Sequence, residues 1–218
     1  MNKKNEDVKK FFHSYASDFN AIYGRTGSAN FFQKALDKHF RKVMFLRMIE
    51  TIKDLSSDEI KSILDIGCGP GRYSSEFMKL NKKVVAIDLA QGMLDIAKTT
   101  TLNIKTGSIE FILANYLEHP FDKKFDAACL MGLLDYIEDP VKLLKKLNTE
   151  VSKIICLSFP KSKGLLAWQR KIRYRLRNCP LYLYTKTEIE TFMFKSGMAG
   201  KYSIKDLGRD YYVKIDLR

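Results

Sequence analysis

The sequence predicts an α/β protein built on a doubly wound, mostly parallel sheet. From Ile60 onward, short apolar segments alternate with helical patterns, which is typical of parallel strands joined by helices. The segment Ile63–Arg72 also leads from an apolar strand through a glycine-rich turn directly into a helix. The chain has 218 residues, of which 45% are hydrophobic. That is enough to form the core of one compact domain.

The strands and helices can be placed in order along the chain. Five strands are expected at Ser62–Ile66, Lys83–Asp88, Ile109–Ala114, Phe125–Met131 and Lys153–Phe159. Helices fit between them at Arg72–Leu80, Gln91–Thr99 and Pro140–Leu147. Near the end, Lys186–Ser196 is expected to be helical, and Lys201–Leu207 and Asp210–Asp216 to form a hairpin that turns at Gly208. The result is a seven-stranded sheet with an antiparallel C-terminal strand.

The first sixty residues are expected to be helical. Apolar residues recur at helical spacing over Val8–Ile22, and glycines then break the pattern. A second helix is expected at about Phe31–Leu55. No linker, repeat or low-complexity stretch is present, so we expect one domain over residues 1–218. It divides into an N-terminal helical part (1–58), a central core (60–159) and a C-terminal part (160–218) with an insertion and the hairpin.

Charge and composition limit the partners and the location. The formal net charge of +13 favours anionic partners, such as nucleic acid, phosphorylated or carboxylated small molecules, or anionic lipid, and selects none of them. The four cysteines are isolated in sequence, which predicts buried thiols and no metal site. No apolar run approaches the roughly 20 residues that span a bilayer, and the charged first residues lack a signal core, so a cytoplasmic location is expected.

The strongest local signal is the spacing of the glycines after the first core strand. Gly67, Gly69 and Gly71 form a GxGxG pattern, whereas a dinucleotide-binding turn has GxGxxG. Asp65 lies two residues before the first glycine. A carboxylate there would repel a pyrophosphate and suits a cationic amino-acid group. An NAD-dependent oxidoreductase is therefore disfavoured.

Asp65–Gly71 resembles motif I of the class I S-adenosylmethionine-dependent methyltransferases. The resemblance extends to Asp88, which would accept hydrogen bonds from the ribose hydroxyls, and to Leu89–Leu94, which would pack on the adenine. Asn115 occupies a position where aspartate is common and a polar residue meets the adenine amino group. Backbone near Met131–Leu133 would lie beside the methionine part of the cofactor. Order and length match over Val8–Leu217, and the specific motifs lie within Ile63–Ile137.

The resemblance implies that S-adenosyl-L-methionine is the cofactor. The residues expected to bind it are Asp65, Gly67, Cys68, Gly69, Gly71, Asp88, Leu89, Met93, Asn115, Tyr116, Met131 and Gly132. Structural alternatives stay open for some of them. Asp88 could cap a helix, Asn115 could be a turn residue, and Leu89 and Met93 suit the core in either case.

The same resemblance places the N-terminal helices as a lid over the cofactor and the insertion after strand five over the acceptor. Transfer of a methyl group from a sulfonium is an in-line displacement that depends mainly on positioning, so no catalytic triad is required. The candidates on the acceptor side are His13, Tyr15, Asp135 and Tyr136. His13 could equally be a surface histidine, and Asp135 and Tyr136 could have a structural role in their loop.

The insertion is basic and bears interleaved aromatic residues. Between Lys161 and Asn178 the basic residues are Lys161, Lys163, Arg170, Lys171, Arg173, Arg175 and Arg177. This composition suits an anionic or membrane-associated acceptor, and an ordinary amphipathic helix with a solvated basic face explains it as well.

The predicted function is methyl transfer to a small-molecule acceptor. Segments such as Ser158–Pro160 resemble methyltransferases of the quinone and magnesium-protoporphyrin groups. An RNA methyltransferase is the main alternative, but Met131–Leu134 replaces the Asn/Asp-Pro-Pro-Tyr type of motif, and Cys179-Pro180 has the wrong order and place for a Pro-Cys nucleophile. No specific nucleic acid is therefore expected. A non-catalytic S-adenosylmethionine-binding protein is the second alternative. No oligomeric state follows from the sequence.

Overall fold

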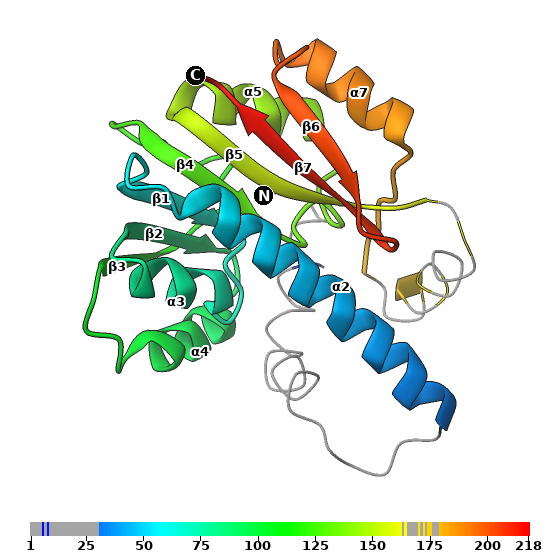
Figure 1. The fold of residues 1–218 in the computed structure, drawn as a ribbon, viewed down its shortest axis with the longest axis horizontal. Coiled ribbons are helices and arrows are strands. Elements are labelled where there is room, and N and C mark those ends of the chain that lie inside the picture. The colour runs from blue at the N-terminus through cyan, green and yellow to red at the C-terminus, as the bar shows by residue number, and fades with distance from the viewer. Residues whose placement is uncertain are drawn as a thin grey trace.

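A computed structural model describes residues 31–162, 164, 170, 172, 174, 175 and 179–218, together with Glu6 and Val8. For residues 31–40 only the backbone is described. The centre is a seven-stranded sheet with the strand order β3-β2-β1-β4-β5-β7-β6 (Figure 1). Its strands are β1 (Ser62–Ile66), β2 (Lys83–Asp88), β3 (Ser108–Leu113), β4 (Phe125–Leu130), β5 (Val151–Pro160), β6 (Tyr202–Asp206) and β7 (Asp210–Asp216). Strands β1 to β5 pair in parallel, and β7 runs antiparallel to both β5 and β6.

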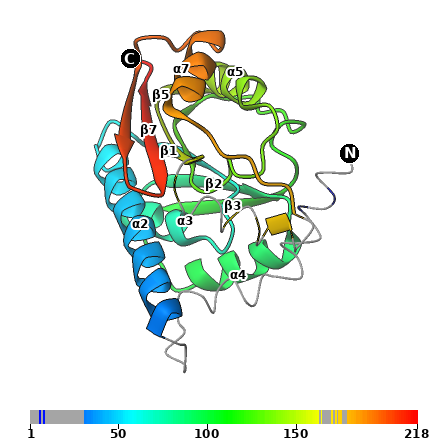
Figure 2. The same cartoon turned by 90° about the vertical axis from the view of Figure 1, so that its right-hand side faces the viewer.

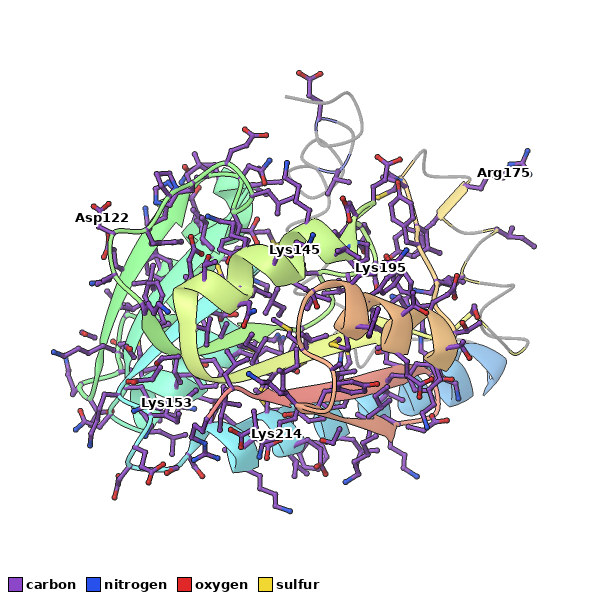
Figure 3. The ribbon with its side chains drawn as sticks, turned by 90° about the horizontal axis from the view of Figure 1, so that it is seen from above. Asp122, Lys145, Lys153, Arg175, Lys195 and Lys214 are labelled. Carbon is purple, nitrogen blue, oxygen red and sulfur yellow. The ribbon has the colours of Figure 1, made fainter. Side chains whose placement is uncertain are left out.

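Helices cover both faces of this sheet. They are α2 (Phe31–Leu55), α3 (Arg72–Lys79), α4 (Gln91–Thr101), α5 (Pro140–Glu150) and α7 (Lys186–Lys195). Helices α5 and α7 lie on one side of the sheet, and α2, α3 and α4 lie on the other (Figures 1 and 2). Seen from above, α5 and α7 are side by side and carry the exposed Lys145 and Lys195 (Figure 3). The doubly wound, mostly parallel fold with an antiparallel C-terminal strand is therefore confirmed.

Alternate residues of the central strands face opposite helical layers. In β1, Leu64 and Ile66 belong to the cluster beneath α5 and α7, whereas Ile63 belongs to the cluster beneath α2 and α3. Residues of β2, β4 and β5 divide in the same way. A strand that is buried on both faces has no polar side to expose, which explains why these strands are almost continuously apolar in sequence.

Several boundaries differ from the prediction by one residue, and larger differences occur at the end of α4, at the start of β5 and at the end of α5, which is at Glu150 rather than Leu147. Helix α4 continues to Thr101, beyond the expected Thr99, and the hydroxyls of Thr99, Thr100 and Thr101 donate to carbonyls four residues earlier at 2.9–3.1 Å. Strand β5 begins at Val151 rather than Lys153 and follows α5 without a loop. Val151 there pairs with Phe125, and the register shifts before Ala127.

The second half of α2 forms a layer of the core. Val43 and Leu55 are buried, and Asp54 accepts hydrogen bonds from the Tyr212 hydroxyl at 2.8 Å and Lys214 Nζ at 2.9 Å. Residues 1–30, the earlier part of the expected N-terminal lid, lie outside the described residues apart from Glu6 and Val8. The division of the chain at residues 58 and 160 stays a prediction.

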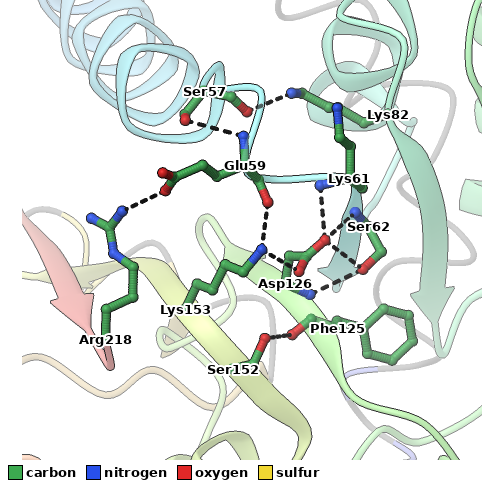
Figure 4. A network of polar contacts seen from close by, with 10 residues as sticks. All are labelled: Ser57, Glu59, Lys61, Ser62, Lys82, Phe125, Asp126, Ser152, Lys153 and Arg218. Atoms are coloured by element: carbon green, nitrogen blue, oxygen red, sulfur yellow. Dashed lines mark hydrogen bonds and ion pairs between the residues drawn. The ribbon is translucent and has the colours of Figure 1, made fainter.

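Polar contacts hold the strands together at the edge where they begin (Figure 4). Asp126 Oδ2 accepts hydrogen bonds from the backbone N–H groups of Lys61 at 2.8 Å and Ser62 at 2.9 Å, and Oδ1 pairs with Lys153 Nζ at 2.8 Å. These contacts join β1, β4 and β5. The opposite edge, where the strands end, carries the candidate site. None of the described helices combines the length and the apolar character needed to cross a membrane.

Candidate functional site

The glycine-rich turn joins the end of β1 to the start of α3. Gly67, Gly69 and Gly71 have φ angles of 66°, 53° and 75°, in the left-handed region that glycine adopts without a steric cost. The N–H of Gly67 donates to the Ile87 carbonyl oxygen at 2.8 Å, and the N–H of Ser75 donates to that of Gly71 at 2.8 Å as the helix begins. The turn is therefore held both by β2 and by the first helical hydrogen bond.

The surroundings of these glycines differ in a way that identifies the open side of the turn. A Cβ on Gly71 would lie 2.9 Å from Ala97 Cβ, and one on Gly67 would lie 2.9 Å from Leu133 Cδ1. A Cβ on Gly69 would meet no atom within 4 Å among the described residues. Gly67 and Gly71 thus allow close packing inside the protein, whereas Gly69 leaves its backbone accessible to a ligand.

Asp88 lies directly opposite this open backbone, at the end of β2. Its Oδ2 accepts a hydrogen bond from the N–H of Gly69 at 2.9 Å, and its Oδ1 accepts one from the N–H of Ala90 at 2.9 Å. Burial raises the pKa of this carboxyl despite these bonds. Each carboxylate oxygen keeps further lone pairs, which two ribose hydroxyls could use. The bond to Ala90, the N-cap residue of α4, shows that Asp88 also supports the start of that helix.

Asp65 supplies a second carboxyl next to the turn. It is buried, and the Ser74 hydroxyl donates to its Oδ2 at 2.6 Å. Burial, together with the nearby negative charge of Asp88, raises the pKa of Asp65 to about 7 although the Ser74 bond opposes this. Two adjacent carboxyls favour a cationic group and disfavour a pyrophosphate.

The other residues expected near the turn are largely buried. Cys68 lies within the turn with its thiol covered, and burial raises the pKa of that thiol far above its usual value. All four cysteines are buried and free. Met93 packs with Ala90 beneath the start of α4, and Leu89 is half-buried next to Asp88.

Asn115 and Tyr116 follow β3 and have local partners. The N–H of Ala114 donates to the Asp88 carbonyl oxygen at 3.1 Å, which places this segment next to the end of β2. Asn115 Oδ1 accepts the N–H of Leu117 at 3.1 Å, so Asn115 has the turn role that the sequence left open. The Tyr116 side chain points away into the core, where its hydroxyl donates to Glu150 Oε2 at 2.7 Å. An adenine contact by that side chain is therefore not supported.

Met131 and Gly132 follow β4 at the same edge of the sheet. Leu133 is the residue that a side chain at Gly67 would strike, so this loop borders the glycine turn. Gly132 has a φ of 80°, and its N–H donates to Ser158 Oγ at 2.9 Å. The structure thus brings the ends of β1, β2 and β4 together, as a site for one extended ligand requires.

The four acceptor-side candidates have different outcomes. Asp135 is buried and paired with Arg170, and burial raises its pKa while the Arg170 charge opposes the rise. The Tyr136 and Tyr174 hydroxyls are 2.9 Å apart, and burial raises the pKa of Tyr136 well above its usual value. These contacts support the structural alternative for Asp135 and Tyr136. His13 and Tyr15 lie outside the described residues.

Sequence reasoning missed Arg47, which contacts both Ser158 and Asp210 at this edge. Arg47 Nη1 lies 3.2 Å from Ser158 Oγ and 3.2 Å from Asp210 Oδ2. Arg47 and Ser158 are separated by 111 positions in the chain, so no local pattern links them.

The arrangement fits the cofactor that the sequence predicts. Open backbone at Gly69 allows a ligand to approach, Asp88 retains acceptor capacity for hydroxyl groups, and Asp65 provides negative charge for an ammonium group. The two carboxyls and the glycine turn lie together at the carboxyl ends of parallel strands, where ligands bind in sheets of this kind.

Comparisons with known proteins agree with this geometry. Residues 63–152 match the model of the family described as "Methyltransferase domain". A ubiquinone biosynthesis O-methyltransferase of Hydrogenovibrio crunogenus is 34% identical over 98 residues, covering 44% of this chain and 40% of that protein. One from Xanthomonas euvesicatoria pv. vesicatoria is 28% identical over 152 residues, covering 66% of this chain and 59% of that protein. The chain thus spans about two fifths to three fifths of the length of these relatives.

Solved structures show the same fold over almost the whole chain. Magnesium protoporphyrin IX methyltransferase from Synechocystis PCC 6803 with bound SAH has a TM-score of 0.74 at 17% identity, covering 99% of this chain and 100% of that one. A SAM-dependent methyltransferase from Thermotoga maritima has a TM-score of 0.68 at 14% identity, covering 96% and 99%. At these identities the structures establish the fold. The family match covers residues 63–152, which include the glycine turn, and this part of the chain is a methyltransferase domain, in agreement with the resemblance to the class I S-adenosylmethionine-dependent methyltransferases.

Proposed function

We propose that this protein binds S-adenosyl-L-methionine at the edge formed by β1, β2 and β4 and transfers its methyl group to a small-molecule acceptor. The observation that carries the proposal is the contact between Asp88 and the N–H of Gly69 at 2.9 Å. It sets a carboxylate with spare acceptor capacity beside the Gly69 backbone, where an added Cβ would meet no atom of the described residues within 4 Å. The proposed binding residues are those named from the sequence, except that Asn115 and Tyr116 would contribute through their backbone.

The residues of the site would act mainly by positioning. Asp88 would bind the ribose hydroxyls, and ionised Asp65 would attract the ammonium group. The bound cofactor would supply a methyl group on a positively charged sulfur, which is a good leaving group. The loop after β4 would then have to hold the acceptor in line with that methyl group. Asp135 is held by Arg170, so it is not proposed as a base.

Three observations support a small molecule as the acceptor. The curated relatives are named as ubiquinone biosynthesis O-methyltransferases, and one structural neighbour is named for a magnesium protoporphyrin. The loop after β4 also lacks the motif of base-directed enzymes. Support for an anionic acceptor is weaker, because Lys161 and Arg170 of the insertion already pair with Asp206 at 2.6 Å and with Asp135. Association of the acceptor with a membrane and the expected cytoplasmic location stay predictions.

Two measurements test this proposal. Calorimetry should show binding of S-adenosylmethionine and of S-adenosylhomocysteine, and no heat with NADH. Incubation with methyl-labelled cofactor and a cell extract, followed by mass spectrometry, should then identify a labelled metabolite. Label in bulk RNA without a labelled metabolite would favour the RNA alternative. Tight binding without turnover on a broad acceptor panel would favour a non-catalytic binding protein.

A further inference from the structure

The loop between β4 and α5 is held near its start, at Gly132, and at its middle, at Asp135, by one continuous set of buried polar contacts. Near the start of the loop, the N–H of Gly132 donates to Ser158 Oγ at 2.9 Å. The same hydroxyl accepts a hydrogen bond from Arg47 Nη1 at 3.2 Å. Ser158 belongs to β5 and Arg47 to α2, so two distant parts of the chain meet at the backbone of this loop.

The contacts then return to the loop three residues further along. Arg47 Nη1 pairs with Asp210 Oδ2 at 3.2 Å, and Asp210 Oδ1 pairs with Arg170 Nη1 at 3.4 Å. Arg170 Nη2 in turn pairs with Asp135 Oδ2. We call this closed set the polar ring: Gly132, Ser158, Arg47, Asp210, Arg170 and Asp135. The side chains of its four charged members are at most 10% exposed.

The charges of the polar ring argue against a role in binding an anion. Two arginines are matched by two aspartates, so the ring is formally neutral, and its guanidinium groups already face carboxylates. Buried ion pairs of this kind contribute little net stability, but removing one partner leaves an uncompensated buried charge. The polar ring is therefore suited to fixing the loop after β4 in one position relative to α2, β5 and β7.

We propose that Ser158 and Arg170 are positioning residues that act on the cofactor through this loop. The inference rests on the proposed function, because it takes the backbone at residues 131–133 to border the amino-acid end of the bound cofactor. Ser158 orients the N–H and the left-handed backbone of Gly132. Arg170, which comes from the insertion on the acceptor side, holds Asp135 in the middle of the loop. Arg170 thereby influences cofactor affinity through Asp135 and the loop.

A matched pair of serines on β5 tests the first half of the inference. Ser158→Ala removes the hydroxyl that accepts from Gly132, whereas Ser152→Ala removes a hydroxyl that donates to the Phe125 carbonyl oxygen at 3.1 Å. Ser158 lies near the end of β5 and Ser152 near its start, away from the site. We expect Ser158→Ala to weaken binding of S-adenosylhomocysteine about tenfold, and Ser152→Ala to change it less than about twofold. Both variants are measured by calorimetry and by thermal unfolding.

A matched pair of arginines tests the second half. Arg170→Gln breaks the polar ring, and Arg175→Gln removes the same charge from an exposed position of the same segment (Figure 3). We expect Arg170→Gln to bind S-adenosylhomocysteine about tenfold more weakly than the unaltered protein, and Arg175→Gln to bind it with unchanged affinity. The double variant Asp135→Asn/Arg170→Gln should recover part of the affinity, since it no longer leaves Asp135 as an uncompensated charge.

The outcomes separate this inference from the proposed function. If the unaltered protein does not bind S-adenosylhomocysteine, the proposed function is wrong and the inference falls with it. If the unaltered protein binds but Ser158→Ala and Arg170→Gln bind equally well, the inference alone is wrong. Equal loss of affinity in Ser152→Ala or Arg175→Gln would also overturn it, because the effect would then follow from general loss of stability or charge.

Discussion

Asp88 and Gly69 are joined by a hydrogen bond of 2.9 Å from the glycine N–H to Asp88 Oδ2. This bond connects the end of β2 to the middle of the turn after β1, where no described side chain covers the backbone. The other carboxylate oxygen accepts from the N–H of Ala90 at the start of α4. One side chain therefore organises the turn, the next helix and the surface offered to a ligand.

Replacing Asp88 by alanine should weaken binding of S-adenosylmethionine by about 1–3 kcal/mol, because two ribose hydroxyls and the Gly69 N–H would lose their acceptor. Asp95→Ala is the control, since Asp95 is an exposed carboxylate of α4 that bonds only to Gln91 Nε2 among the contacts described, at 2.7 Å. Calorimetry of both variants decides the matter. An unchanged dissociation constant for Asp88→Ala would mean that the site is misplaced.

Asp65 should make cofactor binding depend on pH near neutrality. Burial and the neighbouring Asp88 raise its pKa to about 7, so a large fraction of Asp65 is protonated in the unliganded protein at neutral pH. A cationic ligand favours the ionised form. Affinity should therefore increase as the pH rises from about 6 to about 8, with release of a proton on binding. Calorimetry in buffers of different ionisation enthalpy measures that proton, and Asp65→Asn should abolish most of the pH dependence.

The same shift has the opposite effect on the stability of the unliganded protein. Because the folded-state pKa of Asp65 is raised, folded protein binds more protons than unfolded protein between the ordinary pKa of 3.8 and about 7. The stabilising contribution is fully present below that range and is lost as the pH rises through about 7. Compared with Asp65→Asn, the unaltered protein should lose thermal stability over this range. A difference between the two proteins that does not vary with pH would contradict the assigned pKa.

The sequence was sufficient where local signals mark an element. Strands β1 and β2 and helix α2 have their expected bounds, because Asp88 and the glycines mark strand ends and the α2 pattern ends before Ser56. It was insufficient where partners are remote. Asp135 was named as a candidate for catalysis from its place after β4. The sequence does not show its ion pair with Arg170, because that pair depends on how a separate insertion packs. Tyr116 was likewise expected to bind the cofactor, and the sequence did not show that its hydroxyl has a core partner, Glu150, on α5.

Alanine at Gly71 and at Gly69 should separate stability from binding. A Cβ at Gly71 would lie 2.9 Å from Ala97 Cβ in addition to occupying a left-handed backbone, so Gly71→Ala should lower the free energy of unfolding by about 2–4 kcal/mol. Gly69→Ala has only the backbone strain, about 1–2 kcal/mol, but its methyl group would occupy the open side of the turn.

Denaturant unfolding and calorimetry distinguish the two glycine variants. Gly69→Ala should keep more stability than Gly71→Ala while losing more cofactor affinity than its stability loss explains. Normal cofactor affinity in Gly69→Ala would place the ligand away from the turn, and equal stability of the two variants would show that the contact with Ala97 relaxes easily.

Asp126 should contribute to stability without affecting the site. Its carboxylate accepts from the backbone N–H groups of Lys61 and Ser62 and pairs with Lys153 at the edge opposite the glycine turn (Figure 4). Asp126→Ala leaves those N–H groups without an acceptor and should lower the free energy of unfolding by about 1–3 kcal/mol. Asp122→Ala, in an exposed loop (Figure 3), is the control and should have little effect.

The pH dependence of the Asp126 contribution has a definite sign. Burial raises the pKa of Asp126, but the hydrogen bond from Lys153 and those from Lys61 and Ser62 outweigh it, so the pKa lies below its ordinary value. The contribution is therefore present above the unfolded-state pKa and is lost as the pH falls through the folded-state pKa. The stability difference between the unaltered protein and Asp126→Ala should shrink on acidification, with cofactor affinity equal in the two at neutral pH. A difference that persists in acid would assign the effect to packing rather than to the carboxylate.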